Sequence, residues 1–104
     1  MANGILGQSA PSATTNTTVY TVPASKTATF TVNICNRGSS TVSVRLAVAA
    51  TGTPGNSEWI EYDARIPALG VLERSGIVAQ ATKNVVVYSS AATVSVSVYG
   101  FEEV

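Results

Sequence analysis

The chain has 104 residues, and its six basic and six acidic side chains give a formal charge of zero at pH 7. This length predicts one domain with a core that needs no disulfide, and the single cysteine, Cys35, excludes a disulfide within the chain. The sequence contains no basic run that would attract nucleic acid or an anionic membrane surface.

The residue types favour β-sheet with a weakly charged surface. The chain contains 15 Val, 13 Thr and 12 Ser, whereas only 12% of its residues are charged, against an average of ~25% for globular domains. Proteins with little net charge tend to associate. We therefore expect part of the surface to be covered in an assembly.

Residues 1–16 form the first predicted unit, an extended N-terminal arm. Ile5 and Leu6 are its bulky apolar residues, and the Gly-, Pro- and Ser-rich sequence around them has no helical or strand periodicity. Such a segment is either a frayed terminus or an arm anchored on a neighbouring subunit by Ile5 and Leu6. The arm lacks the pattern of a signal peptide, and no apolar stretch approaches the ~18 to 20 residues of a membrane span. We expect assembly in a host cytoplasm.

Residues 17–104 form the second predicted unit, a β domain. Its first strand, Thr17–Val22, ends at Pro23 because proline cannot donate to a strand ladder. Within Thr27–Ala49, apolar and polar residues alternate on both sides of the sequence NRGSS, which is the pattern of two strands with one buried face each. Because the NRGSS residues suit a tight turn, we predict that these two strands pair as a β-hairpin.

The second half of the chain continues the β pattern. A surface loop is predicted at Ala50–Ser57, which is rich in Gly, Pro and Asn. Seven or eight short strands with no helical segment predict an all-β fold, a two-sheet antiparallel β-sandwich with Ig-like or jelly-roll-like Greek-key connections. The strands predicted after the loop are Glu58–Asp63, Ile66–Leu72, Glu73–Ala79, Asn84–Ser89 and Thr93–Phe101.

Residues suited to catalysis or metal binding are sparse. The chain has no histidine to activate a serine or Cys35, no glycine-rich phosphate loop, and one potential zinc ligand where four are needed. Glu61 and Asp63 share a face of their predicted strand, about 7 Å apart, and the simplest interpretation is a pair of rim carboxylates beside Arg65. We therefore expect no enzymatic activity, no cofactor and no metal.

Glu58–Asp63 contains the residues best suited to binding. In a regular strand Trp59 and Tyr62 point to opposite faces, which places one in the core and the other exposed, unless both belong to the core. Exposed Trp and Tyr are common in binding hot spots and stack on sugar rings. A carbohydrate- or receptor-binding module that uses Trp59, Tyr62 and the Ala50–Ser57 loop is therefore one alternative function.

Six segments, taken in order along most of the chain, resemble small virion structural proteins of tailed bacteriophages, including those of cyanobacterial phages. Ser25 and Thr82 stand before Lys26 and Lys83 where a turn glycine is expected, which changes turn geometry rather than role. The segments that carry the resemblance are Leu6-Gly7-Gln8 with Pro11, Tyr20–Ala24, Asn33–Arg37, Ile60–Asp63, Leu72–Ile77 and Val98–Glu102.

The resemblance implies a non-enzymatic head decoration or cement protein on the outer surface of a phage capsid. Its partners are then the major capsid protein and other copies of itself, and we expect a homotrimer at three-fold positions of the shell that bridges capsomers. A neck, tail or fibre component of the virion is the alternative within the same class. The candidate interaction residues are Ile5, Leu6, Gln8, Pro11, Trp59, Glu61, Tyr62, Asp63 and Arg65.

Overall fold

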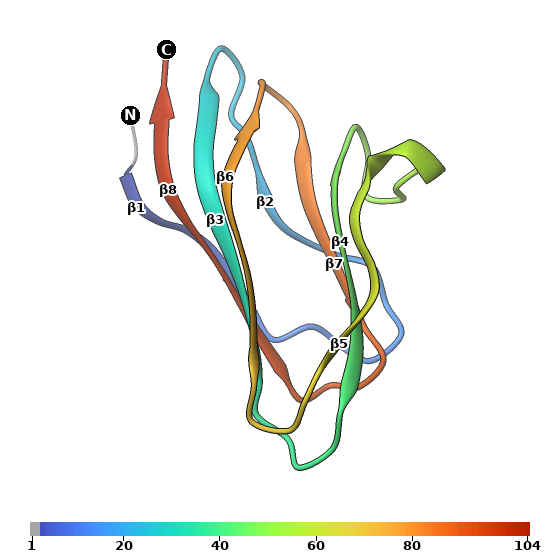
Figure 1. Ribbon diagram of the computed structural model, residues 1–104. Coiled ribbons are helices and arrows are strands. Elements are labelled where there is room, and N and C mark those ends of the chain that lie inside the picture. Colours follow the sequence, from blue (N-terminus) through green and yellow to red (C-terminus); the bar gives the residue numbers. More distant parts are fainter. Residues whose placement is uncertain (1–2) are drawn as a thin grey trace.

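Strands make up most of the computed structural model, which describes residues 3–104 (Figure 1). A short 3-10 helix, η1, precedes the fifth strand. The elements in chain order are β1 (Asn3–Ser9), β2 (Thr17–Thr21), β3 (Thr27–Asn36), β4 (Val42–Ala49), η1 (Asn56–Glu58), β5 (Trp59–Ile66), β6 (Val71–Ala79), β7 (Asn84–Ser89) and β8 (Val94–Glu103).

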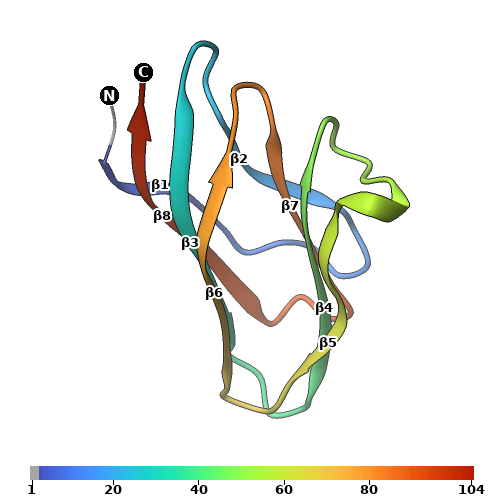
Figure 2. The ribbon, with the colours of Figure 1, turned by 45° about the horizontal axis from the view of Figure 1, so that its top comes forward.

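Within residues 3–104 these strands form two four-stranded antiparallel sheets that pack face to face (Figures 1 and 2). The first sheet has the order β1-β8-β3-β6 and the second the order β2-β7-β4-β5. Consecutive strands of this described part therefore cross from one sheet to the other, except for β4 and β5. This arrangement confirms the predicted two-sheet sandwich, and its strand order is that of an eight-stranded jelly roll rather than an Ig-like fold.

The two strands predicted to form a hairpin lie in different sheets. β3 pairs with β6 and β8, whereas β4 pairs with β5 and β7, so the hairpin prediction for Thr27–Ala49 is wrong. Alternation does not separate the two arrangements, because both strands turn one apolar face to the same core. Asn36, at the end of β3, stabilises the connection that crosses from β3 to β4 in the other sheet. Its Nδ2 donates to the Ser40 carbonyl at 2.8 Å and to the Ile66 carbonyl at 3.2 Å, and its Oδ1 accepts from the Gly38 N–H.

The core lies between the inner faces of the two sheets. Burial of each large apolar side chain there stabilises the fold by about 1.5–3 kcal/mol. In β3, and in the first parts of β4 (Val42 to Leu46) and β8 (Val94 to Val98), the alternation is regular and its apolar positions are buried. The largest fully buried side chains are Phe30, Ile34, Leu46, Ile66, Val22, Val32, Val44, Val85, Val86, Val87, Val94 and Val96.

The run of three valines in β7, Val85–Val87, is buried on both sides of its sheet. The first and third valines belong to the core between the sheets, whereas Val86 packs on the outer face beside Ala47, Ala49 and the half-buried Trp59. A continuous apolar run of this kind is typical of a strand that is buried on both faces or against a partner. The first of these applies, so the outer face of the second sheet has a small apolar layer of its own.

A buried polar pair links the two sheets. The hydroxyl of Tyr20 on β2 donates to Glu102 Oε2 on β8 at 2.5 Å, and the Tyr20 ring packs edge-to-face on Phe30 with ring centres 6.1 Å apart. Burial, and then the hydrogen bond to Glu102, raise the pKa of the Tyr20 hydroxyl above its ordinary value. Glu102, which the sequence places in a short acidic tail, is thus part of the sandwich.

The segment predicted to be an extended arm contains an edge strand of the first sheet. Asn3 to Ser9 pairs antiparallel with β8, and Leu6 packs against the core. A Cβ added to Gly7 would lie 2.3 Å from the Val19 carbonyl oxygen, so β1 passes close to β2. Residues 1 and 2 of the predicted arm lie outside the described residues, and residues 10–16 connect β1 to β2.

The strand predicted at Ile66–Leu72 is wrong: β5 ends at Ile66, β6 begins at Val71, and residues 67–70 form the tight turn between them. The Gly70 N–H donates to the Pro67 carbonyl at 2.9 Å, which closes the turn. β6 then runs unbroken from Val71 to Ala79 through a register shift that contains Gly76, at φ 72°. Pro67 directly follows β5 and so marks the end of that strand.

Candidate functional site

The predicted interaction residues fall on two different sheets and do not form one site. Ile5, Leu6 and Gln8 lie on β1, followed by the buried Pro11, whereas Trp59, Glu61, Tyr62, Asp63 and Arg65 lie on β5 at the edge of the other sheet. The outer faces of the two sheets point in opposite directions (Figure 2). The molecule therefore offers two separate candidate surfaces.

On the second sheet, an irregular stretch of β5 brings Trp59 and Tyr62 together. Their ring centres are 5.4 Å apart at an interplanar angle of 76°, an edge-to-face contact. The register between β4 and β5 shifts on both sides of Leu46, and Asp63 adopts a positive φ of 54°. Such a bulge breaks the two-residue alternation, so the prediction that Trp59 and Tyr62 point to opposite faces is wrong.

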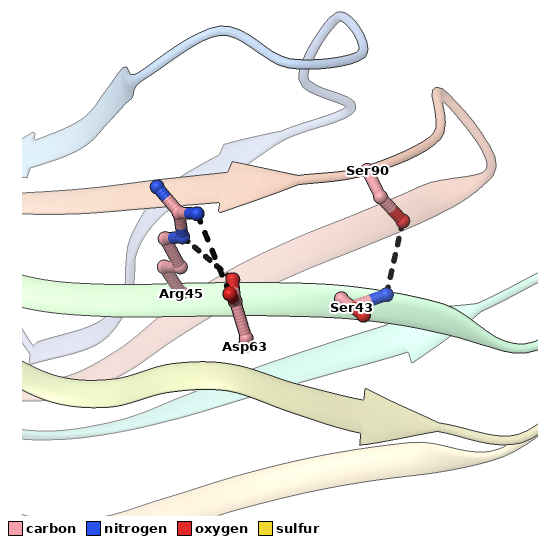
Figure 3. Close-up of polar contacts among 4 residues, drawn as sticks. All are labelled: Ser43, Arg45, Asp63 and Ser90. Carbon is pink, nitrogen blue, oxygen red and sulfur yellow. Dashed lines mark hydrogen bonds and ion pairs between the residues drawn. The ribbon is translucent and has the colours of Figure 1, made fainter.

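Arg45 on β4 is the centre of this group. Its guanidinium lies 4.2 Å from the centre of the Tyr62 ring and 4.4 Å from that of Tyr88, and its Nε donates to Asp63 Oδ1 at 2.7 Å (Figure 3). The hydrogen bond to Asp63 raises the pKa of Arg45. We call Arg45, Trp59, Tyr62, Asp63 and Tyr88 the aromatic-arginine cluster.

Sequence reasoning missed two members of this cluster, Arg45 and Tyr88. Both lie on the polar side of their strands by simple alternation, and the pairing of β4 with β7 places them directly opposite each other. The alternation of polar and apolar residues was the available signal for the sheet face that each side chain occupies. It does not show which strands are neighbours, because this depends on the topology of the whole domain.

The acidic residues of β5 serve as two separate ion-pair partners. Glu61 pairs with Arg74 on β6, which ties the edge of the second sheet to the edge of the first. Asp63 pairs with Arg45 on the outer face. The prediction of one pair of rim carboxylates beside Arg65 is therefore wrong, because the bulge turns Glu61 and Asp63 to different sides of the strand.

The loop between β4 and η1 is ordered by Glu58. Its carboxylate accepts from the Ala50 N–H at 2.9 Å and from the Gly55 N–H at 2.8 Å. The hydrogen bond from Gly55, and then that from Ala50, lower the pKa of Glu58. Residues 50–57 are largely exposed, as predicted, and their order is fixed next to Trp59.

On the first sheet, apolar side chains spread over the outer surface of three strands. Ile5, Val78, Tyr99 and Phe101 have exposed fractions between 36% and 63%, and we call them the apolar face. Phe101, Thr29 and Val78 are successive partners across β8, β3 and β6, while Ile5 is the partner of Tyr99.

The surroundings of the apolar face are mostly uncharged. Thr29, Thr31 and Asn33 of β3 occupy its middle. The hydroxyl of Tyr99 donates to Glu73 Oε2 at 2.8 Å, and this hydrogen bond raises the pKa of Tyr99. The face thus combines exposed apolar area with the carboxylates of Glu73, which Tyr99 contacts, and of Glu103, two residues after Phe101 on β8.

Within residues 3–104 no group of three His, Cys, Asp or Glu side chains is placed to hold a metal ion, and no cavity is present. No helix of this part of the chain is long and apolar enough to cross a membrane. Comparison of the chain with protein-family models, with curated proteins and with solved structures finds no match.

Proposed function

We propose that the protein is a non-enzymatic virion structural protein that binds the outer surface of a phage capsid as a decoration or cement protein. The observation that carries the proposal is the apolar face of the first sheet. Large exposed apolar side chains on a rigid sheet mark interaction surfaces in soluble proteins. The resemblance of the sequence to small phage virion proteins supplies the kind of partner, the major capsid protein.

The chemistry of the apolar face suits a shell that must resist pressure from packaged DNA. Each Å² of apolar surface buried against the shell contributes roughly 25 cal/mol, and this area must be exposed again before two bridged capsomers separate. Aromatic side chains such as Tyr99 and Phe101 are enriched at the centres of such contacts. The threonines among these side chains carry no charge, so their burial against the shell requires no desolvation of ions.

The edge strand β1 suits contacts between copies of the chain. An edge strand has backbone N–H and C=O groups on the side away from its neighbour, and another chain can pair with them. Ile5 lies on this strand and belongs to the apolar face. We expect three copies to meet along this edge at the three-fold positions of the shell, so that each trimer bridges adjacent capsomers.

The test uses particles of the phage that encodes the chain, prepared without the protein, to which purified variants are added. The unchanged protein is expected to bind in hundreds of copies per particle, in a multiple of three. The double variant V78D/F101S should reduce occupancy at least tenfold, because a carboxylate and a hydroxyl replace apolar contacts. Leu69→Ala is the matched control, since Leu69 is an exposed apolar residue outside both surfaces.

Three outcomes would overturn the proposal. Absence of particle binding by the unchanged protein would remove it, and full occupancy by the folded V78D/F101S variant would remove the apolar face as the contact. A copy number of a handful or a few dozen would instead support a neck, tail or fibre component. Circular dichroism of each variant confirms that a loss of binding is not a loss of fold.

A further inference from the structure

We propose that the aromatic-arginine cluster on the outer face of the second sheet is a binding site for a neutral glycan. This site is separate from the apolar face, so the proposal does not rest on the capsid-binding function. A single small protein would then contact a shell through one sheet and a saccharide through the other.

Tyr62 is an exposed aromatic ring held in a fixed orientation. Its exposed fraction is 58%, although Trp59 contacts it edge-to-face and the Arg45 guanidinium lies over it. Trp59 in turn rests on Ala47, Ala49 and Val86. A ring immobilised in this way loses little side-chain entropy when a ligand stacks on it. The apolar C–H face of a pyranose ring is a ligand surface that such an aromatic accepts.

The cluster also presents planar hydrogen-bonding groups next to the ring. The Asp63 side chain is 48% exposed and the Arg45 side chain 25%, so both retain accessible polar atoms while they pair with each other. A carboxylate accepts two hydrogen bonds from neighbouring hydroxyls, and a guanidinium donates two in a fixed fork. Vicinal hydroxyls of a sugar match this spacing, and the same sugar stacks on the adjacent ring.

The backbone conformation at Asp63 sets the geometry of the cluster. Asp is one of the few non-glycine residues that adopt a positive φ readily, so the sequence permits a bulge at this position. Asp63 has φ 54° in the middle of β5, and this bulge is what brings Asp63 and Tyr62 to the side on which Arg45 lies. A regular strand would keep the ion pair and the aromatic pair apart.

The charges of the cluster favour a neutral ligand. The Arg45 charge is balanced by Asp63, and the Glu58 carboxylate is occupied by the N–H groups of Ala50 and Gly55. Nucleic acid requires several cations along a groove, whereas Arg65 is the cation that adjoins the cluster on β5. A sugar without carboxylate or sulfate groups fits the aromatic ring and the paired Arg45 and Asp63 without separating this ion pair.

The experiment presents the purified full chain to an array that carries neutral, sialylated and sulfated glycans. Neutral hits are then measured by saturation-transfer NMR, which detects millimolar binding. Tyr62→Ala is expected to weaken the best neutral hit at least tenfold, because it removes the stacking surface. Asp63→Asn should weaken it several-fold, since one acceptor becomes a donor. Tyr62→Phe keeps the ring and should retain most of the affinity.

A substitution outside the cluster serves as the control for glycan binding. Leu69→Ala removes a comparably exposed apolar side chain from the β5–β6 turn and should leave glycan binding unchanged. The proposal is overturned if no neutral glycan binds, if sialylated or sulfated glycans alone bind, or if the folded Tyr62→Ala protein binds as the unchanged protein does. Binding of a protein partner by the cluster, with no glycan bound, overturns it as well.

Discussion

The outer faces of the two sheets differ in how regular their strands are. In the first sheet, the central strands β3 and β8 pair without interruption over ten consecutive partners, and Tyr99 and Phe101 of the apolar face lie along this pair. The outer strands of that sheet each have one register shift, near Ile5 in β1 and near Gly76 in β6. In the second sheet, the register between β4 and β5 shifts twice within a few residues, and the aromatic-arginine cluster lies at this irregularity. The comparison teaches that a row of exposed side chains follows from the regular pairing of β3 and β8, whereas the convergence of Arg45, Tyr62 and Asp63 depends on the irregular pairing of β4 and β5.

The largest effect is expected from a substitution in the core that the two sheets share, because loss of the fold removes both outer faces. Phe30 is fully buried in the core and packs against Tyr20. Phe30→Ala should lower the free energy of unfolding by about 3–5 kcal/mol, because it removes a large apolar side chain and leaves a cavity. Urea denaturation followed by circular dichroism measures the loss. A decrease below ~1 kcal/mol would show that the two sheets do not depend on this contact.

A glycine substitution tests the regular pairing of the first sheet. A Cβ at Gly100 would lie 2.0 Å from the Thr29 carbonyl oxygen, so β8 and β3 must move apart locally. Gly100→Ala is expected to cost about 1–3 kcal/mol, as overpacked positions do. At Gly55 the nearest atom to an added Cβ is 3.7 Å away, and Gly55→Ala serves as the matched control. Equal denaturation midpoints for the two variants would contradict the close approach.

A substitution of Arg45 tests the irregular outer face of the second sheet. Arg45→Lys keeps the charge but loses the flat group that lies over Tyr62 and Tyr88 and donates to Asp63. We expect a fall in the urea midpoint smaller than that of Gly100→Ala, together with changed ring chemical shifts of Tyr62 and Tyr88. Particle binding through the apolar face should stay at its original occupancy. Unperturbed tyrosine resonances would be incompatible with the stacked arrangement.

The smallest effect is expected from acid titration of the loop beside the cluster. The folded-state pKa of Glu58 is lowered by its two backbone hydrogen bonds, so Glu58 stabilises the fold above its unfolded pKa of about 4.3. This contribution is lost as the pH falls through the lowered folded-state pKa. NMR of the Ala50 and Gly55 amides should follow this titration, and Glu58→Gln should abolish it. Amides that stay unchanged below pH 3 would refute the role of Glu58.

Local patterns in the sequence were sufficient for the core and for most strands, but not for β1 or for the turn between Ile66 and Val71. Phe30, Val32 and Ile34 alternate with threonines and asparagine, and the apolar set is buried as the two-residue period requires. The same pattern could not decide whether β3 and β4 pair, because a jelly roll and a hairpin bury the same side chains. Long-range topology settles that choice, through contacts such as the one from Asn36 to the Ile66 carbonyl.

The candidate site was accessible from the sequence only in part. Trp59, Tyr62 and Asp63 were recognised by residue type, and all three belong to the cluster. Their contact with Arg45 and the convergence of their side chains depend on the bulge at Asp63. Little in the sequence indicated this bulge, because no glycine marks the position of positive φ. Exposure of the apolar face was also missed at Val78 and Phe101, because alternation assigns a side chain to a face without stating what covers that face.

The pairing of β1 with β8 has a practical consequence for engineering the fold. Asn3 is the partner of Phe101, so the first and last described strands run side by side at one end of the sandwich (Figure 1). A short Gly/Ser linker from Val104 to residue 3 would join them, and the exposed loop at residues 50–57 offers a place for new ends. Such a circular permutant would display a fused peptide next to Trp59, at the rim of the second sheet.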